Sequence, residues 1–133
     1  MNILVVDDDL FELAVHINEL RERGAVIHEL NSVSEAMVYV ADLSIALDLV
    51  IIDVMMPTET LFSGDSTEDG RLTGICLAEM VHELRPSVKI ALITVRKDQR
   101  FLSLLPNLPI AGILFKPCTP RDFCERVQEI LKG

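Results

Sequence analysis

The 133-residue sequence has few of the residues that define several classes of protein. Its three cysteines are odd in number and lack C-x-x-C spacing, and none of its three histidines falls near a cysteine ligand pattern, so neither disulfides nor zinc are predicted. Only 12 basic residues stand against 21 acidic ones, which argues against direct binding to nucleic acid or an anionic membrane. No apolar run approaches a membrane span and no signal-peptide pattern opens the chain, so we expect a cytoplasmic protein.

The residues that are present indicate one packed domain over residues 1–133. Half of them are hydrophobic, and neither a linker nor an internal repeat interrupts the chain. Runs of consecutive apolar residues, typical of parallel strands covered on both faces, recur at four places. These runs are Ile3–Val6, Leu49–Ile52, Ile90–Ile93 and Ile113–Phe115. A weaker run at residues 25–30 alternates with polar residues, which is typical of an edge strand.

Five helical stretches alternate with these strands. The first begins at Leu10 and stops at Gly24, and the second opens with a capping box formed by Ser32 and Glu35. A third stretch ends at Arg85, a fourth runs from Gln99 to Leu105, and a fifth opens at Thr119. The alternation predicts an α/β fold, a doubly wound five-stranded parallel sheet with five helices and right-handed crossovers.

Polar side chains follow four of these strands where each strand ends. They are Asp7 and Asp8, then Asp53, Thr94 and Lys116. The carboxyl ends of parallel strands share one edge of the sheet, and ligands bind there where the strand order reverses. We therefore expect these side chains to gather at one rim.

The aspartate run in ILVVDDD (residues 3–9) allows two interpretations. One carboxylate can cap a helix that starts at Leu10, where the helix dipole favours anions. A cap needs only one carboxylate, and adjacent carboxylates repel each other, so the others indicate a bound cation. Carboxylates from neighbouring strands offer the oxygen ligands that Mg²⁺ prefers.

The same rim has the groups needed for phosphoryl transfer. A carboxylate can attack a phosphoryl group and form an aspartyl phosphate, while Mg²⁺, a lysine and a hydroxyl neutralise the charge on the phosphoryl oxygens. Glycine-rich phosphate loops of the GxGxxG and Walker types have no match in the sequence. The residues therefore predict a site that takes a phosphoryl group onto itself.

The motifs ILVVDDD, LVIIDVMMP, ALIT and ILFKP, in this order and at strand ends, resemble the receiver domain of two-component response regulators. The resemblance covers nearly the whole chain and implies a flavodoxin-like strand order of 2-1-3-4-5. It also implies that the chain is no enzyme beyond catalysing its own phosphorylation and dephosphorylation.

The resemblance assigns a role to each residue of the rim. Asp53 is the phosphoacceptor, Asp8 is a direct Mg²⁺ ligand, and Asp7 is a ligand acting through water. The metal set further contains Asp53 itself and the backbone carbonyl of Met55. Thr94 bonds one phosphoryl oxygen, and Lys116 pairs with another next to a cis peptide bond to Pro117.

Three features depart from the family pattern. An insert at about residues 58–73 replaces a very short loop; it is turn-rich and acidic, which predicts either a passive surface segment or one that contacts a partner or the site. Val95 and Arg96 follow Thr94, where the family generally has a small residue first, so we expect slow turnover with small donors. Ile113 stands where an aromatic residue often serves as a switch.

The predicted function is that of a receiver in a two-component system. A sensor histidine kinase or a phosphotransfer protein phosphorylates Asp53, and the modified surface changes binding to a downstream protein. The alternative is a docking module with the same fold that works without phosphorylation. A phosphohydrolase of the dehalogenase type is less favoured, since Met55 stands where its second aspartate is expected. The sequence leaves open whether the chain stands alone or forms part of a larger regulator.

Overall fold

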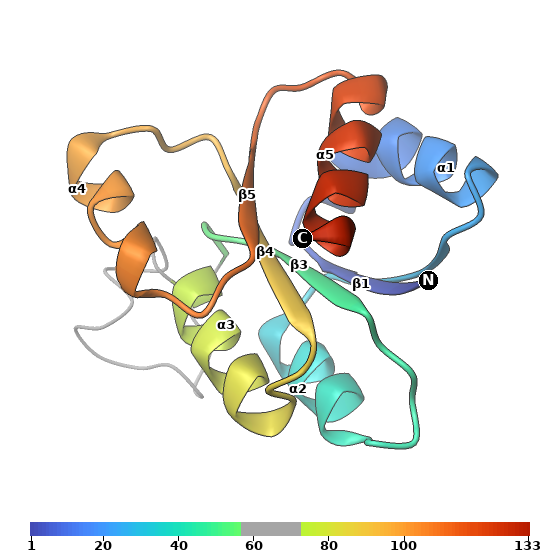
Figure 1. The fold of residues 1–133 in the computed structure, drawn as a ribbon, viewed down its shortest axis with the longest axis horizontal. Helices are drawn as coiled ribbons and strands as arrows, with labels where there is room; N and C mark the ends of the chain where they lie inside the picture. Colours follow the sequence, from blue (N-terminus) through green and yellow to red (C-terminus); the bar gives the residue numbers. More distant parts are fainter. Residues whose placement is uncertain (57–72) are drawn as a thin grey trace.

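The computed structural model describes residues 1–56 and 73–133 and confirms the α/β fold (Figure 1). A single five-stranded sheet has the order β2-β1-β3-β4-β5, with every neighbouring pair parallel, as the resemblance implied. The strands are β1 (Asn2–Val6), β2 (Val26–Leu30), β3 (Leu49–Asp53), β4 (Lys89–Thr94) and β5 (Gly112–Phe115). The helices are α1 (Ala14–Glu22), α2 (Val33–Ala41), α3 (Thr73–Leu84), α4 (Gln99–Leu102) and α5 (Pro120–Lys132), with 3-10 turns η1 (Leu10–Leu13) and η4 (Leu105–Asn107).

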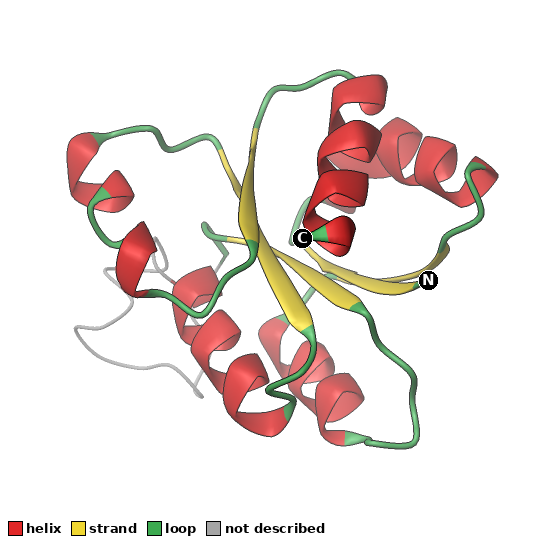
Figure 2. Ribbon diagram, in the orientation of Figure 1, coloured by secondary structure: helices red, strands yellow, loops and turns green. Residues whose placement is uncertain are grey.

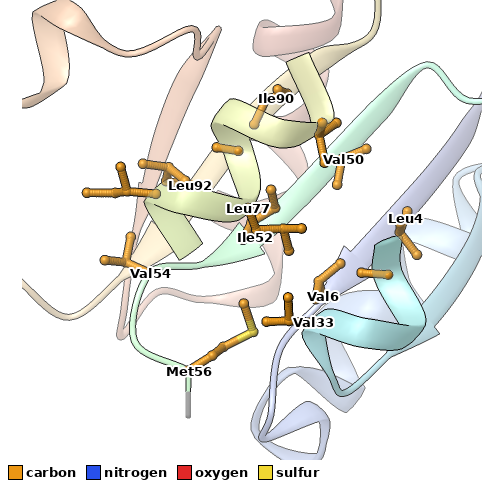
Figure 3. Close-up of a cluster of buried hydrophobic side chains, with 14 of the residues drawn as sticks. Leu4, Val6, Val33, Val50, Ile52, Val54, Met56, Leu77, Ile90 and Leu92 are labelled. Carbon is orange, nitrogen blue, oxygen red and sulfur yellow. The ribbon is translucent and has the colours of Figure 1, made fainter. Parts of the chain in front are cut away.

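Helices cover both faces of the sheet (Figure 2). Alternate residues of β1 point to opposite faces: Ile3 and Val5 pack against α1 and α5, while Leu4 and Val6 pack on the side of α2 and α3. Figure 3 shows this second cluster, in which Leu77 of α3 lies beside the side chains of β3 and β4. Because both faces are buried, the central strands carry the unbroken apolar runs seen in the sequence.

Several predicted element ends are confirmed. Ser32 caps α2 by accepting a hydrogen bond from the Glu35 N–H (3.3 Å), and Thr119 caps α5 by accepting one from the Asp122 N–H (3.0 Å). Gly24 follows α1 with a φ of +102°, which an L residue rarely adopts. Strand β2 lies at an edge of the sheet and buries only Ile27.

Two helix predictions are wrong in detail. The first helix does not begin as an α-helix at Leu10; that segment is the turn η1, and the side chain of the preceding Asp9 makes no capping hydrogen bond among the described residues. The predicted helix over Gln99–Leu105 ends already at Leu102, and the separate 3-10 turn η4 follows it. Phe101 is the one residue that α4 buries, so little packing stabilises a longer helix.

The predicted insert falls mainly outside the described residues. Only Thr73 at its end is described, and it is the fully buried first residue of α3 rather than part of a loop. Within the described part of the chain, no helix combines the length and the apolar character needed to span a membrane.

Candidate functional site

The register of the sheet brings the predicted site residues to one rim. Val6 of β1 pairs with Ile52 of β3, so Asp7 and Asp53 stand at the same level, one residue further along their strands. Thr94 is the last residue of β4, and the Lys116 N–H donates to its carbonyl at 2.8 Å. The carboxyl ends of β1, β3, β4 and β5 thus deliver the polar groups to one place, as parallel strands require.

Three carboxylates form a compact acidic cluster at this rim. One oxygen from each of Asp7, Asp8 and Asp53 lies within 4.8 Å of the others. Asp7 is fully buried, Asp53 is 6% exposed and Asp8 is open to solvent. Like charges this close repel each other, and their hard oxygen donors fit Mg²⁺, which is held in proteins by one or two carboxylates with the remaining positions filled by water or phosphate.

The ammonium group of Lys116 lies beside this cluster. Its Nζ is 2.9 Å from Asp7 Oδ2, and it is 3.8 Å from both Asp53 Oδ2 and Glu12 Oε2. Burial by itself lowers the pKa of Lys116, but the hydrogen bond to Asp7 and the surrounding carboxylates outweigh it and raise the pKa. The lysine therefore stays charged in spite of being buried. The Lys116–Pro117 peptide bond is cis, as the resemblance implied.

Asp53 lies in an environment that disfavours its negative charge. Burial and then the neighbouring Asp7 raise the pKa of Asp53 to about 8, against the opposing effects of Lys116 and the Met55 N–H. A divalent cation among the three carboxylates would favour the ionised form, because it places an opposite charge beside it. Ionisation of Asp53 is thus linked to occupation of the acidic cluster by a cation.

Backbone N–H groups from the adjoining loops fix the orientation of the two buried carboxylates. The Met55 N–H donates to Asp53 Oδ1 at 3.1 Å, and the Asp9 N–H donates to Asp7 Oδ1 at 2.9 Å. The third aspartate of the run therefore supports Asp7 through its backbone instead of capping a helix with its side chain. The structure places Met55 directly after the β3 rim, and its role as a carbonyl ligand stays a prediction.

Gly74 is a part of the site whose contact the sequence did not reveal. A Cβ at this position would overlap the Asp53 carbonyl oxygen and would lie 2.6 Å from Val54 Cα, and both are backbone atoms. The Gly74 N–H also donates to the Val54 carbonyl at 3.0 Å. Glycine at the start of α3 therefore lets the helix approach the chain that carries Asp53. The sequence signal that could have indicated this contact is a glycine in the first turn of a predicted helix.

The loop after β4 is tied together around Thr94 and Arg96. Thr94 is 1% exposed, and its Oγ1 accepts a hydrogen bond from the Arg96 N–H at 3.0 Å. The Arg96 guanidinium donates to both carboxylate oxygens of Asp98, at 2.8 and 2.9 Å, and lies 5.3 Å from the Phe101 ring centroid. Its hydrogen bonds to Asp98 hold the pKa of that carboxyl well below its usual range. Val95, which lies between Thr94 and Arg96 in the sequence, is 57% exposed.

Glu12 is a second residue whose contact, here with Lys116, the sequence did not reveal. It lies on the turn η1, four residues after Asp8, and sequence patterns alone gave no reason to place it near Lys116. The turn itself, which replaces the first part of the predicted helix, brings the side chain back to the rim.

Comparison with known proteins identifies the family of this chain. A model of the response regulator receiver domain matches residues 3–128. The chain is 25% identical over 130 residues to the sensor kinase CckA of Brucella abortus (strain 2308). The matched segment covers 98% of this chain but only 12% of the length of CckA.

Solved structures show the same fold. A CheY-like response regulator receiver domain protein of Methanospirillum hungatei JF-1 superposes with a TM-score of 0.79 at 24% identity, covering 98% of this chain and 93% of that one. The response regulator TrrA of Thermotoga maritima, solved in complex with Mg²⁺ and beryllium fluoride, gives 0.73 at 25% identity, with 97% of each chain covered. The chain belongs to the response regulator receiver domain family.

Proposed function

We propose that this chain accepts a phosphoryl group on Asp53 in a Mg²⁺-dependent reaction and changes its binding to a downstream protein in response. The donor is a sensor histidine kinase or a histidine phosphotransfer protein, and the setting is the cytoplasm. The observation that carries the proposal is the position of Asp53: a buried carboxylate with Asp7 and Asp8 on one side and the Lys116 ammonium 3.8 Å away.

The two other aspartates are less suited to act as the acceptor. Both oxygens of Asp7 already accept hydrogen bonds, from the Asp9 N–H and from Lys116, and the side chain is fully buried. Asp8 is exposed, so the bulk solvent competes with any fixed charges around it. Asp53 is buried but keeps 6% of its surface exposed at the rim.

In the transfer step, an oxygen of Asp53 forms a bond to phosphorus while the bond between phosphorus and the donor's imidazole nitrogen breaks. The electron pair of that bond returns to the imidazole nitrogen, and the ring leaves as neutral imidazole when its other nitrogen carries a proton, so atoms and charge balance. Lys116 and the Thr94 hydroxyl would contact the phosphoryl oxygens, where negative charge is concentrated. Mg²⁺ held by Asp8, Asp53 and the Met55 carbonyl, and by Asp7 through water, would neutralise further charge on the same oxygens.

The experiment that tests the proposal uses a small phosphodonor and intact mass spectrometry. With Mg²⁺ and acetyl phosphate, the protein should gain one phosphoryl group, whereas Asp53→Asn or an excess of EDTA should prevent the gain. Equal labelling of Asp53→Asn, or labelling that persists in EDTA, would reject Asp53 or the metal. A failure to label under any condition would favour a docking module that works without phosphorylation.

The similarity to a known protein and the charge of the chain support one kind of donor and one kind of output partner. Similarity to a segment of a sensor kinase supports an origin of the phosphoryl group in histidine kinase chemistry. A net charge of −9 supports protein partners over nucleic acid for the output.

A further inference from the structure

Glu12 is the outermost of three carboxylates that surround the Lys116 ammonium. The exposed fraction of its side chain is 50%, compared with 0% for Asp7 and 9% for Asp53, while Lys116 itself is 8% exposed. An anion that approaches the lysine from solvent therefore comes close to the Glu12 carboxylate before it reaches the buried groups.

The charges around Lys116 are unbalanced. Asp7, Asp53 and Glu12 lie within 4 Å of this one ammonium, and Asp8 adds a fourth carboxylate at the same rim. Even a divalent cation leaves an excess of negative charge when all four carboxylates are ionised. A phosphodonor is itself an anion, so this excess opposes its entry, and the opposition increases with the charge of the donor.

The three partners of Lys116 differ in how easily they can be replaced by a phosphoryl oxygen. Asp7 is held at 2.9 Å in a buried, hydrogen-bonded pair. Glu12 is 3.8 Å away and half exposed, so its interaction is long and screened by solvent. When a phosphoryl oxygen arrives, Glu12 is the partner that gives way most readily, and until then it competes for the lysine.

We propose that Glu12 is a specificity-determining residue of this site: its carboxylate slows phosphorylation by small, highly charged donors and thereby favours a protein donor. A protein donor offsets the repulsion with contacts far from the reacting atoms, whereas a small anion has no such contacts. This inference rests on the proposed function of Asp53.

The test compares Glu12→Gln with the parent chain at saturating Mg²⁺, using initial rates of Asp53 labelling by intact mass. With acetyl phosphate, a dianion at neutral pH, we expect Glu12→Gln to react about two- to fivefold faster at low salt, the range that corresponds to an exposed ion pair. The gain should shrink at high salt because exposed charges are screened. It should also be smaller with phosphoramidate, which carries less negative charge.

Two control variants separate charge from other effects. Glu22→Gln removes the same charge from an exposed position at the far end of α1 and should leave both rates unchanged. Glu12→Asp keeps the charge and should react closer to the parent chain than Glu12→Gln does. Far-ultraviolet circular dichroism and the unfolding midpoint of each variant show whether the fold is retained.

The outcomes are distinguishable. Labelling of the parent chain with equal rates for Glu12→Gln at low salt would overturn the role of Glu12 alone. A gain that is the same at low and high salt would also overturn it, because the effect would not be electrostatic. If no variant were labelled by either donor, the proposed function of Asp53 and this inference would fall together.

Discussion

Lys116 and Asp7 form a buried ion pair across the rim, with Nζ 2.9 Å from Oδ2 and side-chain exposures of 8% and 0%. The two residues are 109 positions apart in sequence, so the pair ties the chain after β5 to the end of β1. It also holds the lysine next to Asp53, where a phosphoryl oxygen would need it.

Replacing Lys116 with methionine should destabilise the metal-free protein by about 3 kcal/mol, because it leaves buried carboxylates without their cation. Mg²⁺ should recover part of the loss, since a cation among the aspartates replaces some of the missing positive charge. Urea denaturation in EDTA and in Mg²⁺ measures both effects. The control is Lys132→Met at the exposed end of α5, for which a loss of at most about 1 kcal/mol is expected. A Lys116→Met deficit that is unaffected by Mg²⁺ would contradict this account.

Asp53→Asn should stabilise the metal-free protein increasingly as the pH rises. The pKa of Asp53 is raised from 3.8 to about 8 in the folded protein, so between these values the folded chain binds a proton that the unfolded chain has lost. This group's contribution to stability is therefore fully present below pH 4 and is lost as the pH rises toward 8. Asparagine carries no such dependence.

The measurement is the difference in unfolding free energy between Asp53→Asn and the parent chain, from urea denaturation in EDTA at several pH values. We expect the advantage of the variant to grow by at least about 1 kcal/mol between pH 5 and pH 8.5, less than the full shift because neighbouring charges adjust. Mg²⁺ should reduce the advantage at high pH. An advantage that is constant with pH would show that Asp53 keeps its ordinary pKa.

Gly74→Ala should weaken Mg²⁺ binding and labelling of Asp53, because its Cβ would overlap the Asp53 carbonyl oxygen and force the backbone apart. The expected loss of stability is about 2 kcal/mol. Gly24→Ala is the matched control: its Cβ meets nothing within 4 Å, but its φ of +102° strains an alanine by about 1 to 2 kcal/mol. Both variants should lose stability, and only Gly74→Ala should lose Mg²⁺ affinity in calorimetric titration. Equal Mg²⁺ affinity in the two would show that Gly74 serves folding alone.

Much of the fold was predictable because its signals are local. The apolar runs of the buried strands and the caps at Ser32 and Thr119 depend on neighbouring residues only, and they match the structure. The end of α4 was not predictable from periodicity, since a helix that buries only Phe101 has little packing to hold its last turn. The strand order came from a family resemblance.

The candidate site was predictable in its members but not in their contacts. The ends of the predicted strands pointed to the aspartates, Thr94 and Lys116 as site residues. The pairing of Lys116 with Asp7, however, joins residues more than 100 positions apart, and no local pattern predicts it. The contact between Glu12 and Lys116 was missed for the same reason, whereas the contact of Gly74 was missed because it depends on how closely α3 approaches the end of β3. The buried Arg85 is a further case: it donates to the carbonyls of Val40, Asp42 and Ile45, and no sequence pattern marks that partnership.

The last prediction concerns how the loop after β4 responds to a phosphoryl group. If Asp53 is phosphorylated as proposed, the Thr94 hydroxyl would have a charged acceptor to bond, and such a bond is worth about 1.5 to 3 kcal/mol. Moving toward it would break the 3.0 Å bond from the Arg96 N–H. Asp98 binds the Arg96 guanidinium and also accepts from the Phe101 N–H at 3.1 Å, so a shift of Arg96 reaches the cap of α4 directly.

This path does not require Ile113 to act as an aromatic switch. Ile113 is partly buried against the core, and its branched side chain has no polar tip to expose or hide. Beryllium fluoride with Mg²⁺, a mimic of the phosphoryl group, should therefore shift the amide resonances of Asp53, Lys116 and residues 94–101 while the Ile113 rotamer stays unchanged. Thr94→Ala should abolish the shifts at residues 96–101 and keep those at Asp53 and Lys116, because the link to Arg96 is gone but the acidic cluster is intact. A change of the Ile113 rotamer with repacking of α5, or shifts at residues 96–101 that survive in Thr94→Ala, would show that the signal leaves the site by another route.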